Sequence, residues 1–268
     1  MNRLRFLLAF ILCCNLGFSQ DILARNISSS TLSVMMDSQH HEYVDLGLPS
    51  GTLWATCNIG ASVPEENGLF FAWGDVEGHN RDYRFPHEEY KWSEGKGHMF
   101  VNKYTFADKR TYGCWYKDGI YVGTVVDGVT YKNLTNLLPE DDAAMAIWGK
   151  EWCMPTVDQI SELCDKRNTV IKLVKANGVM GYLVRSKRNK KTLFFPTRGS
   201  IPYLEDVPEQ GAYWSCSLCT DDSSCASILK FSSDRVYVDE YLRFYGLMIR
   251  PVRNTRGQAH EKRSITQE

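Results

Sequence analysis

Short stretches of alternating apolar and polar residues dominate the chain between residues 42 and 253. Residues 42–48 alternate in this way up to the turn Pro49-Ser50-Gly51, and residues 53–57 resume the pattern after it. A period of two is typical of strands that bury one face, so the pattern predicts a pair of strands here. Further short strands are predicted at 213–215, 227–231, 235–238 and 247–252.

Two hairpins are predicted between these strands. Residues 121–126 and 129–131 flank Asp127-Gly128, a pair that favours the positive φ angles of a tight two-residue turn. A longer polar turn separates residues 181–185 from residues 192–195. Both hairpins join strands that are neighbours in the sequence, which is typical of antiparallel sheets.

Helical patterns are few. Residues 140–148 begin with acids and continue with alanines, in agreement with helix propensity and with the helix dipole. A second helix is predicted to start at Thr156, which with Gln159 makes a capping box. One face of this helix is predicted from the spacing of Ile160, Leu163 and Cys164. The pattern therefore predicts an α+β, sheet-rich single domain with two short helices.

The two ends of the chain differ from this body. Residues 1–20 have a basic start and a short apolar run, which is typical of a secretory signal peptide cleaved near Ser19 or Gln20. Residues 21–41 are Ser-rich and predicted to be a flexible lead, and residues 254–268 a disordered tail. No stretch has the roughly 20 apolar residues of a membrane helix. The protein is predicted to be secreted, periplasmic or held at the cell surface, with the domain at 42–253.

The charge balance narrows the choice of partner. The 268 residues include 31 Lys and Arg and 32 Asp and Glu, for a net charge of −1. This removes any global electrostatic reason to bind nucleic acid or an anionic membrane. Affinity must therefore come from local features of the surface.

Seven strings along the body together resemble one known family. They are YVDLGLPSGTLWATCNIGAS (43–62), FFAWGD (70–75), LLPEDDAAMAIWG (137–149), WCMPT (152–156), NGVMGYLVRSK (177–187), YWSCS (213–217) and RFYGLMIRPVR (243–253). In this order they resemble the Fibrobacter succinogenes major paralogous domain, an exported bacterial domain. The resemblance implies a compact fold like those of C-type lectins and formylglycine-generating enzymes, and it implies display, adhesion or ligand binding rather than catalysis.

The cysteines depart from the pattern of that family. Cys153 stands where the family usually has Arg, and Cys216 where it usually has Ser. Loss of Cys13 and Cys14 with the signal leaves seven of the nine cysteines. The candidates for disulfides are Cys153, Cys164, Cys216, Cys219 and Cys225. Export permits such bonds, but the spacing does not give their connectivity.

Two chemical alternatives remain open for the cysteine cluster at 216–225. Zinc requires a fourth ligand, from Cys153, Cys164 or a histidine, and no second metal-binding motif supplies one. A thiol oxidase of the formylglycine-generating kind would use paired cysteines, but its active-site motif does not map onto this chain. The Cys-x-x-Cys pair follows a strand, which is the wrong context for a thioredoxin-like centre.

Glu140, Asp141 and Asp142 form an oxygen-rich run at the start of a predicted helix. Hard cations such as Ca²⁺ take six to eight oxygen ligands, so the run is a candidate calcium site. The same acids are also well placed to cap the helix and to interact with its dipole. Both interpretations stay open at the level of the sequence.

Aromatic residues are concentrated between 70 and 121, in a stretch without clean alternation. Phe71 and Trp73 lie in a string shared with the family, so they are assigned to packing. The candidate ligand-binding residues are Tyr83, Tyr90, Trp92, Trp115 and Tyr116. Exposed rings bury large areas against sugars or partner proteins, whereas a buried set would instead pin a long loop.

Arg185 begins a basic run that continues across the predicted turn at 186–191. It is either a contact for acidic glycans or a solvated turn that protects a sheet edge. Three functions follow from these features. The first is a non-catalytic recognition or adhesion module that binds a glycan or a protein, the second is a subunit of a surface assembly such as a fimbrial tip, and the third is a thiol oxidase.

Overall fold

The computed structural model describes residues 35–254 apart from 81–88, 94, 96–100, 102, 105–115, 118–119, 122–123, 127–128, 132–133, 198–209, 220–221 and 234. The strands are β1 Met35–Met36, β2 Glu42–Asp45, β3 Thr52–Ala55, β4 Tyr116–Lys117, β5 Ile120–Tyr121, β6 Thr124–Val126, β7 Val129–Tyr131, β8 Thr169–Ala176, β9 Val179–Ser186, β10 Thr192–Pro196, β11 Gly211–Leu218, β12 Cys225–Phe231, β13 Val236–Leu242 and β14 Val252–Asn254. The helices are the 3-10 turn η1 Pro139–Asp141, α2 Ala143–Trp148 and α3 Val157–Cys164.

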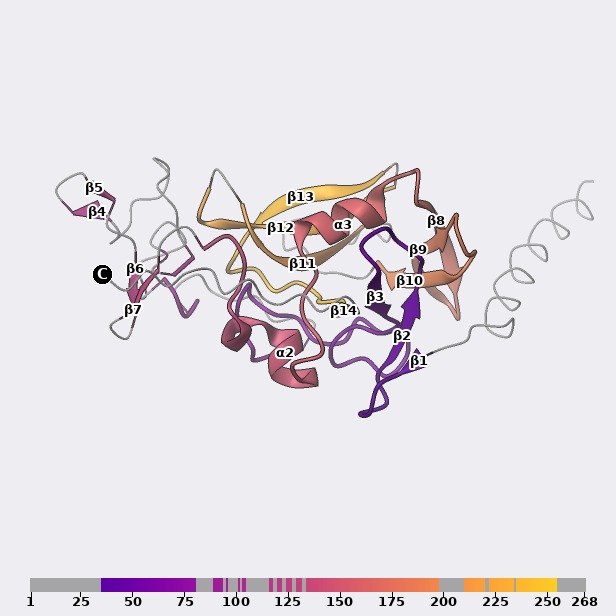
Figure 1. Ribbon diagram of the computed structural model, residues 1–268, viewed down its shortest axis with the longest axis horizontal. Helices are drawn as coiled ribbons and strands as arrows, with labels where there is room; N and C mark the ends of the chain where they lie inside the picture. Colours follow the sequence, from indigo (N-terminus) through magenta and orange to yellow (C-terminus); the bar gives the residue numbers. More distant parts are fainter. Residues whose placement is uncertain are drawn as a thin grey trace, which may run out of the picture.

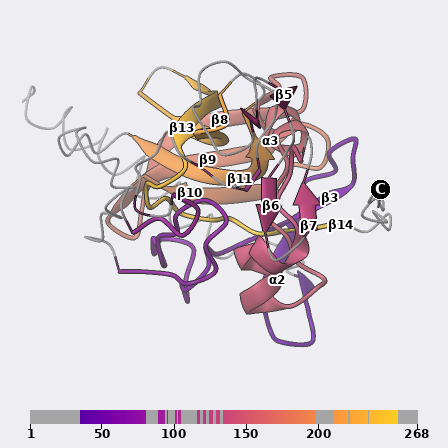
Figure 2. The same ribbon diagram turned by 90° about the vertical axis from the view of Figure 1, so that its left-hand side faces the viewer.

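Antiparallel sheets make up most of this architecture (Figure 1). The strand orders of the three larger sheets are β1-β2-β3-β14, β10-β9-β8 and β11-β12-β13, and two small hairpins pair β4 with β5 and β6 with β7. Helix α3 contacts β11, β12 and β13, while α2 lies on the opposite side of the molecule (Figures 1 and 2). The predicted sheet-rich α+β class with two short helices is confirmed at this level.

The predicted hairpins are confirmed by strand register. Val126 pairs with Val129, on either side of residues 127–128, which lie outside the described residues, and Arg185 pairs with Thr192 across the longer turn. Strand β8 was not predicted, although Thr169–Ala176 pairs along its whole length with β9. The predicted strand at 247–252 is wrong, because only isolated bridges at Leu247 and Met248 precede β14.

The capping box at the start of α3 is present as predicted. The Thr156 hydroxyl accepts a hydrogen bond from the backbone N–H of Gln159, and the Gln159 side chain accepts one from the N–H of Thr156. The other predicted helix, 140–148, is interrupted. Asp142 has an extended backbone, with φ −87° and ψ 109°, because its carboxylate caps α2 instead of continuing the helix.

The predicted boundaries at both ends of the domain need correction. Met35 and Met36 pair with Tyr43 and Glu42, so the last part of the supposed flexible lead is a strand. Asn254, the first residue of the predicted tail, lies in β14 and pairs with Thr52 of β3. Residues 1–34 and 255–268 lie outside the described residues. Among the helices that the structure describes, none has the length and apolar character to cross a membrane.

Tryptophans organise the core. Trp73 donates its Nε1–H to the carbonyl of Ser215 at 2.8 Å, and Trp214 donates its Nε1–H to the carbonyl of Phe71 at 2.8 Å. These reciprocal bonds tie the 71–73 segment to β11 and satisfy two buried indole donors. A second cluster surrounds Trp54, which is fully buried. The first of these clusters includes Tyr90 and Trp92, two of the candidate ligand-binding residues.

Candidate functional site

A buried arginine holds together the aromatic segment that the sequence marked for ligand binding. Arg243 is 1% exposed, and its guanidinium lies 4.7 Å from the Trp73 ring centroid and 5.4 Å from that of Trp92. Tyr90 and Tyr104 also face it, at 5.6 and 6.0 Å. Cations are attracted to the negative faces of such rings, more strongly once both are desolvated. We call these five residues the Arg243 centre.

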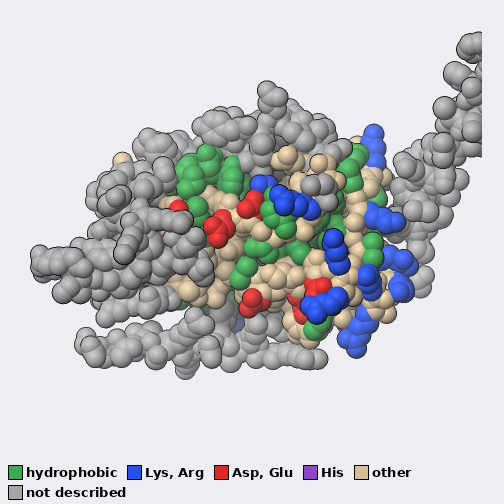
Figure 3. Space-filling model, turned by 90° about the horizontal axis from the view of Figure 1, so that it is seen from above, with side chains coloured by type: hydrophobic (Ala, Val, Ile, Leu, Met, Phe, Trp, Pro, Cys, Tyr) green, Lys and Arg blue, Asp and Glu red, His purple; other side chains and the backbone are tan. Residues whose placement is uncertain are grey.

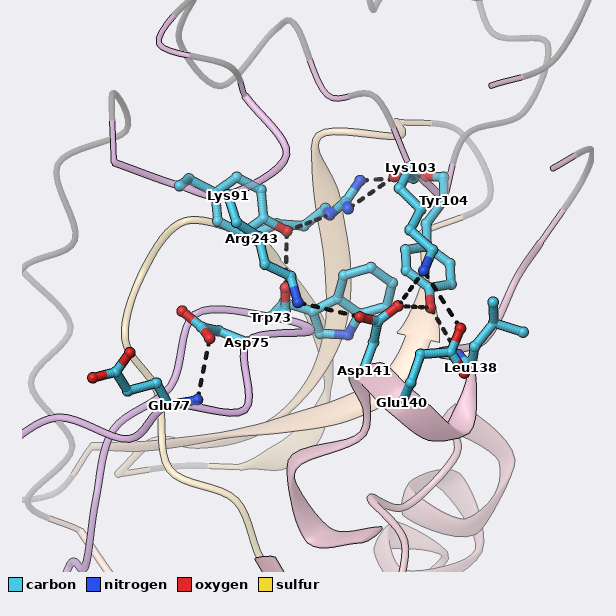
Figure 4. Close-up of polar contacts among 11 residues, drawn as sticks. Trp73, Asp75, Glu77, Lys91, Lys103, Tyr104, Leu138, Glu140, Asp141 and Arg243 are labelled. Carbon is cyan, nitrogen blue, oxygen red and sulfur yellow. Dashed lines mark hydrogen bonds and ion pairs between the residues drawn. The ribbon is translucent and has the colours of Figure 1, made fainter. Parts of the chain in front are cut away.

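The hydrogen bonds of Arg243 go to neutral acceptors (Figure 4). Its Nε donates to the Tyr90 hydroxyl at 3.1 Å, and its Nη2 donates to the carbonyl of Lys103 at 3.0 Å. Nη1 donates to the carbonyls of Ser223 at 2.9 Å and Tyr104 at 3.3 Å. The guanidinium thus joins the segment around residue 90, the segment at 103–104 and the loop after β11. The N–H donors of the guanidinium therefore find acceptors within the protein without any carboxylate.

Asp141 is the anionic counterpart beside this centre (Figure 4). Its carboxylate accepts hydrogen bonds from Lys103 Nζ at 2.6 Å, Lys91 Nζ at 3.1 Å and the Tyr104 hydroxyl at 2.5 Å. The side chains of Asp141 and Lys103 are both largely buried. Burial, together with the Asp141 charge, holds the pKa of Tyr104 far above its usual range, so this phenol stays a neutral donor.

Asp142 is a helix cap with a second structural role. Its carboxylate accepts the backbone N–H groups of Ala144 at 2.9 Å and Met145 at 3.1 Å, and also that of Met154 at 2.9 Å. The cap therefore ties α2 to the strand-like segment before α3. Burial raises the pKa of Asp142 to about 6, although the three backbone hydrogen bonds act in the opposite direction.

These contacts correct the calcium interpretation of Glu140, Asp141 and Asp142. The carboxylates of Asp141 and Asp142 are engaged by protein donors, and Glu140 points to Lys103 at 3.6 Å. A calcium ion would have to displace ammonium and amide donors that already satisfy these oxygens. Within the described ranges, no group of three or more His, Cys, Asp or Glu side chains is placed to hold a metal ion. The capping interpretation is confirmed for Asp142 alone, because Asp141 and Glu140 face lysines and do not cap a helix.

The proposed platform of exposed rings also needs correction. Tyr90 and Trp92 are 2% and 6% exposed, and their rings meet edge to face at 5.7 Å. Their rings pack around Arg243, so they pin a long segment to the core as the alternative interpretation held. Tyr83 and Trp115 lie outside the described residues. Tyr116 in β4 pairs with Tyr121 in β5, but the side chain of Tyr116 is likewise outside the described part of the structure.

Sequence reasoning missed the importance of Arg243. The string 243–253 is notable in the sequence only for its family resemblance. An arginine followed by aromatic residues does not by itself indicate that the arginine is buried. Arg250 in the same string is buried too, where it donates to the side chain of Asn58 at 2.8 Å and to the carbonyl of Phe194 at 3.0 Å. Two buried arginines therefore fix the C-terminal segment to separate parts of the core.

The cysteine candidates separate into distinct places. Cys219 and Cys225 come together at the turn of the β11–β12 hairpin, whereas Cys164 lies on α3 against the Trp54 cluster. The backbone of Cys153 forms an isolated β-bridge with Val252. Burial raises the pKa of Cys216, and the nearby Cys153 adds to that increase. Burial raises the pKa of both Cys153 and Cys164 to about 12, so these are inert thiols at neutral pH. All five are free thiols in the structure.

Basic side chains gather over the end of the molecule formed by β8, β9 and β10 (Figure 3). The exposed cations of these strands and their turns, called the basic end below, are Lys166, Arg167, Lys172, Lys175, Arg185, Lys187, Arg188 and Lys190. Arg185 pairs with Val170 in register, so Lys172, two positions along β8, faces the same side of the sheet. Among the described residues, Arg167 is the only one of these cations that forms an ion pair with a carboxylate, that of Asp165.

A few acids border the basic end, and Glu65 accepts a hydrogen bond from Asn177 Nδ2 at 2.8 Å at the turn between β8 and β9. Asp165 forms a 2.5 Å ion pair with Arg167, and Glu162 accepts hydrogen bonds from the backbone and the hydroxyl of Ser50. Apart from that of Arg167, the positive charge of the basic end is therefore not cancelled by partners within the sheet. Such a surface attracts a polyanion, and more strongly at low ionic strength.

Comparison with known proteins found no matching family model, no matching curated protein and no matching solved structure.

Proposed function

We propose that this protein is an exported, non-catalytic recognition module that binds an acidic polysaccharide through its basic end. The observation that carries the proposal is the set of exposed cations on β8, β9 and the turn after β9, without carboxylate partners among the described residues. The net charge of the chain is −1, so a group of cations at one end means that charge is distributed unevenly over the surface. A polyanion would therefore bind at that end and not over the whole protein.

Strand geometry gives the basic end a regular spacing. Residues two apart on a strand lie on the same face about 7 Å from each other, and neighbouring strands are about 4.8 Å apart. Lys172 on β8 and Arg185 on β9 occupy such positions. A polymer with a carboxylate on each sugar presents charges repeatedly, so several weak contacts with lysine and arginine act together.

The predicted export and the fold class both favour this proposal. The apolar N-terminal run favours secretion, where polysaccharides are available as ligands. The resemblance to the Fibrobacter succinogenes major paralogous domain, and the C-type-lectin-like fold that it implies, also favour ligand recognition at a cell surface. The sheet-rich architecture with two helices agrees with this expectation at the level of class.

One observation favours a second candidate, a subunit of a surface assembly. Strand β8 is the last in its sheet, and Val170 on it is 39% exposed, so its outer edge offers a place for a strand of another chain. However, Lys172 and Lys175 on the same strand are exposed, and edge lysines discourage strand addition. We therefore place polysaccharide binding first.

The test compares two forms of one polymer. Immobilised polygalacturonate carries a carboxylate on each sugar, and its fully methyl-esterified form has the same backbone without charge. We expect the protein to bind the charged form at least about tenfold more tightly, and we expect this preference to disappear in 0.5 M NaCl, where screening shortens the Debye length to about 4 Å.

Other results would exclude the proposal. Equal binding to the charged and esterified polymers would show that the cations do not recognise the ligand. Equally tight binding to duplex DNA would reduce the basic end to a general polyanion surface. Absence of any saccharide preference, together with recovery of the protein in a complex with other surface proteins, would favour the assembly subunit.

A further inference from the structure

Cys219 and Cys225 face each other at the turn of the β11–β12 hairpin. The last paired residues of this hairpin before the turn are Leu218 and Ala226, and the next position on each side is a cysteine. The backbone N–H of Cys219 donates to the carbonyl of Cys225 at 3.3 Å. Each thiol is the largest influence on the pKa of the other, so the two side chains lie close together. The pair is thus brought together by the backbone pairing of the hairpin.

This backbone geometry suits a disulfide. Opposed residues of an antiparallel pair have Cα atoms about 4.5–5.5 Å apart. A disulfide requires Cα atoms about 4.4–6.8 Å apart. Cys219 and Cys225 can therefore be joined without moving the strands that carry them. No other cysteine pair in the described part of the chain occupies opposed positions of one hairpin.

We propose that Cys219 and Cys225 form a disulfide by exchange with a small external disulfide, in which Cys225 attacks and Cys219 resolves. Disulfide formation by this pair does not depend on polysaccharide binding, and the two cysteines have different roles in it.

The surroundings of the two thiols distinguish their roles. Cys225 is half-buried, whereas Cys219 is 2% exposed, so an external disulfide reaches Cys225 more easily. The hydrogen bond from Cys219 lowers the pKa of Cys225, while the nearby Asp222 and Glu240 carboxylates act in the opposite direction. The Cys225 thiol, burial and the nearby Glu240 carboxylate raise the pKa of Cys219. In the exchange proposed here Glu240 accepts the Cys219 proton.

The exchange balances in two steps. The Cys225 thiolate attacks one sulfur of the external disulfide, and the other sulfur leaves as a thiolate, which takes up a proton from solvent. Cys219 then gives its proton to Glu240 and attacks the Cys225 sulfur, and the second external thiolate leaves and takes up the proton from Glu240. The two cysteines are oxidised to one disulfide, and one molecule of external disulfide is reduced to two thiols.

The disulfide would fix a loop that the Arg243 centre uses. The carbonyl of Ser223 accepts from Arg243 Nη1, and the carbonyl of Ser224 accepts from the Arg243 backbone N–H at 3.0 Å. Both serines lie between the two cysteines in the sequence. Closing this short loop restricts the unfolded chain, and we expect the melting temperature to rise by about 5 °C.

The test uses the full chain, purified under reducing conditions and then incubated with oxidised glutathione. Differential alkylation and peptide mapping should find Cys219 and Cys225 joined to one another, with Cys57 and Cys164 still open to alkylation after unfolding. This part of the experiment needs no variant. Retention of two alkylatable thiols at 219 and 225, while other cysteines become oxidised, would overturn the proposal.

Two serine variants test the roles within the pair. Cys219→Ser should trap a glutathione adduct on Cys225, because the resolving thiol is absent. Cys225→Ser should give at least about tenfold less adduct on Cys219 in the same time, because Cys219 is buried and keeps its proton. Cys57→Ser is the matched control and should form the 219–225 disulfide at the unaltered rate. Equal adduct formation by the two variants would overturn the assignment of roles.

Discussion

Replacement of Arg243 by methionine removes the cation that joins three segments of the chain while keeping a long apolar side chain in its place. The change leaves three buried carbonyls, those of Lys103, Tyr104 and Ser223, without this donor, and the Tyr90 hydroxyl loses a partner as well. A buried polar group left without its hydrogen bond costs about 1–3 kcal/mol. Because some of these groups will find other partners, we expect a loss of about 3–5 kcal/mol in the free energy of unfolding.

The loss is large beside the about 5–15 kcal/mol by which a domain is usually stable. Arg243→Lys keeps the charge but not the planar fork that reaches several carbonyls at once, so we expect an intermediate loss of about 2 kcal/mol. Urea unfolding followed by tryptophan fluorescence measures both, since Trp73 and Trp92 lie against the guanidinium.

A matched control separates burial from charge. Arg167 is 90% exposed, and Arg167→Met should leave the unfolding midpoint unchanged. A loss below about 1 kcal/mol for Arg243→Met would refute the reasoning, because such a value is typical of a surface substitution. In that case the buried carbonyls would have to be satisfied by other donors.

Two further predictions concern buried sites. The pKa of Asp142 rises from 3.8 to about 6 on folding, so stability from this group is present below pH 4 and is lost as the pH rises to about 6. The stability of the wild type relative to Asp142→Asn should therefore fall by about 3 kcal/mol between pH 4 and pH 7 in urea titrations, and a constant difference would contradict it. A Cβ atom at Gly181 would lie 2.2 Å from Phe194 Cζ and 2.5 Å from the Phe195 carbonyl, so Gly181→Ala should lose about 2 kcal/mol by overpacking. Gly178→Ala is no test of packing, because its φ of 85° adds strain, whereas an unchanged melt for Gly181→Ala would show that the sheet adjusts.

Local signals in the sequence were sufficient for several elements. Thr156 and Gln159 make a capping box that depends only on residues three apart, and the pairing of Val126 with Val129 follows from the preference of the two residues between them in the sequence. Both are decided by short-range physics. Asp142 was recognised as a potential cap, but its extended backbone divides the predicted helix in two.

Long-range contacts account for what the sequence pattern could not reveal. The burial of Tyr90 and Trp92 depends on Arg243, about 150 positions away along the chain, which lies against both rings. Lys103 and Asp141 satisfy one another in the core, although each alone suggests an exposed position. The basic end was visible as a run of charges, but only the pairing of β8 with β9 adds Lys172 to it.

The most direct measurement of the central claim is the affinity for polygalacturonate of two variants with the same change in charge. Arg185→Glu reverses one cation of the basic end, and Lys150→Glu reverses an exposed cation just after α2. At low salt, two charges about 4 Å apart interact by about 1 kcal/mol in water, so reversal from attraction to repulsion should weaken binding by about tenfold or more. The account predicts this loss for Arg185→Glu and wild-type affinity for Lys150→Glu. Equal loss in the two variants, or no loss in either, would contradict it.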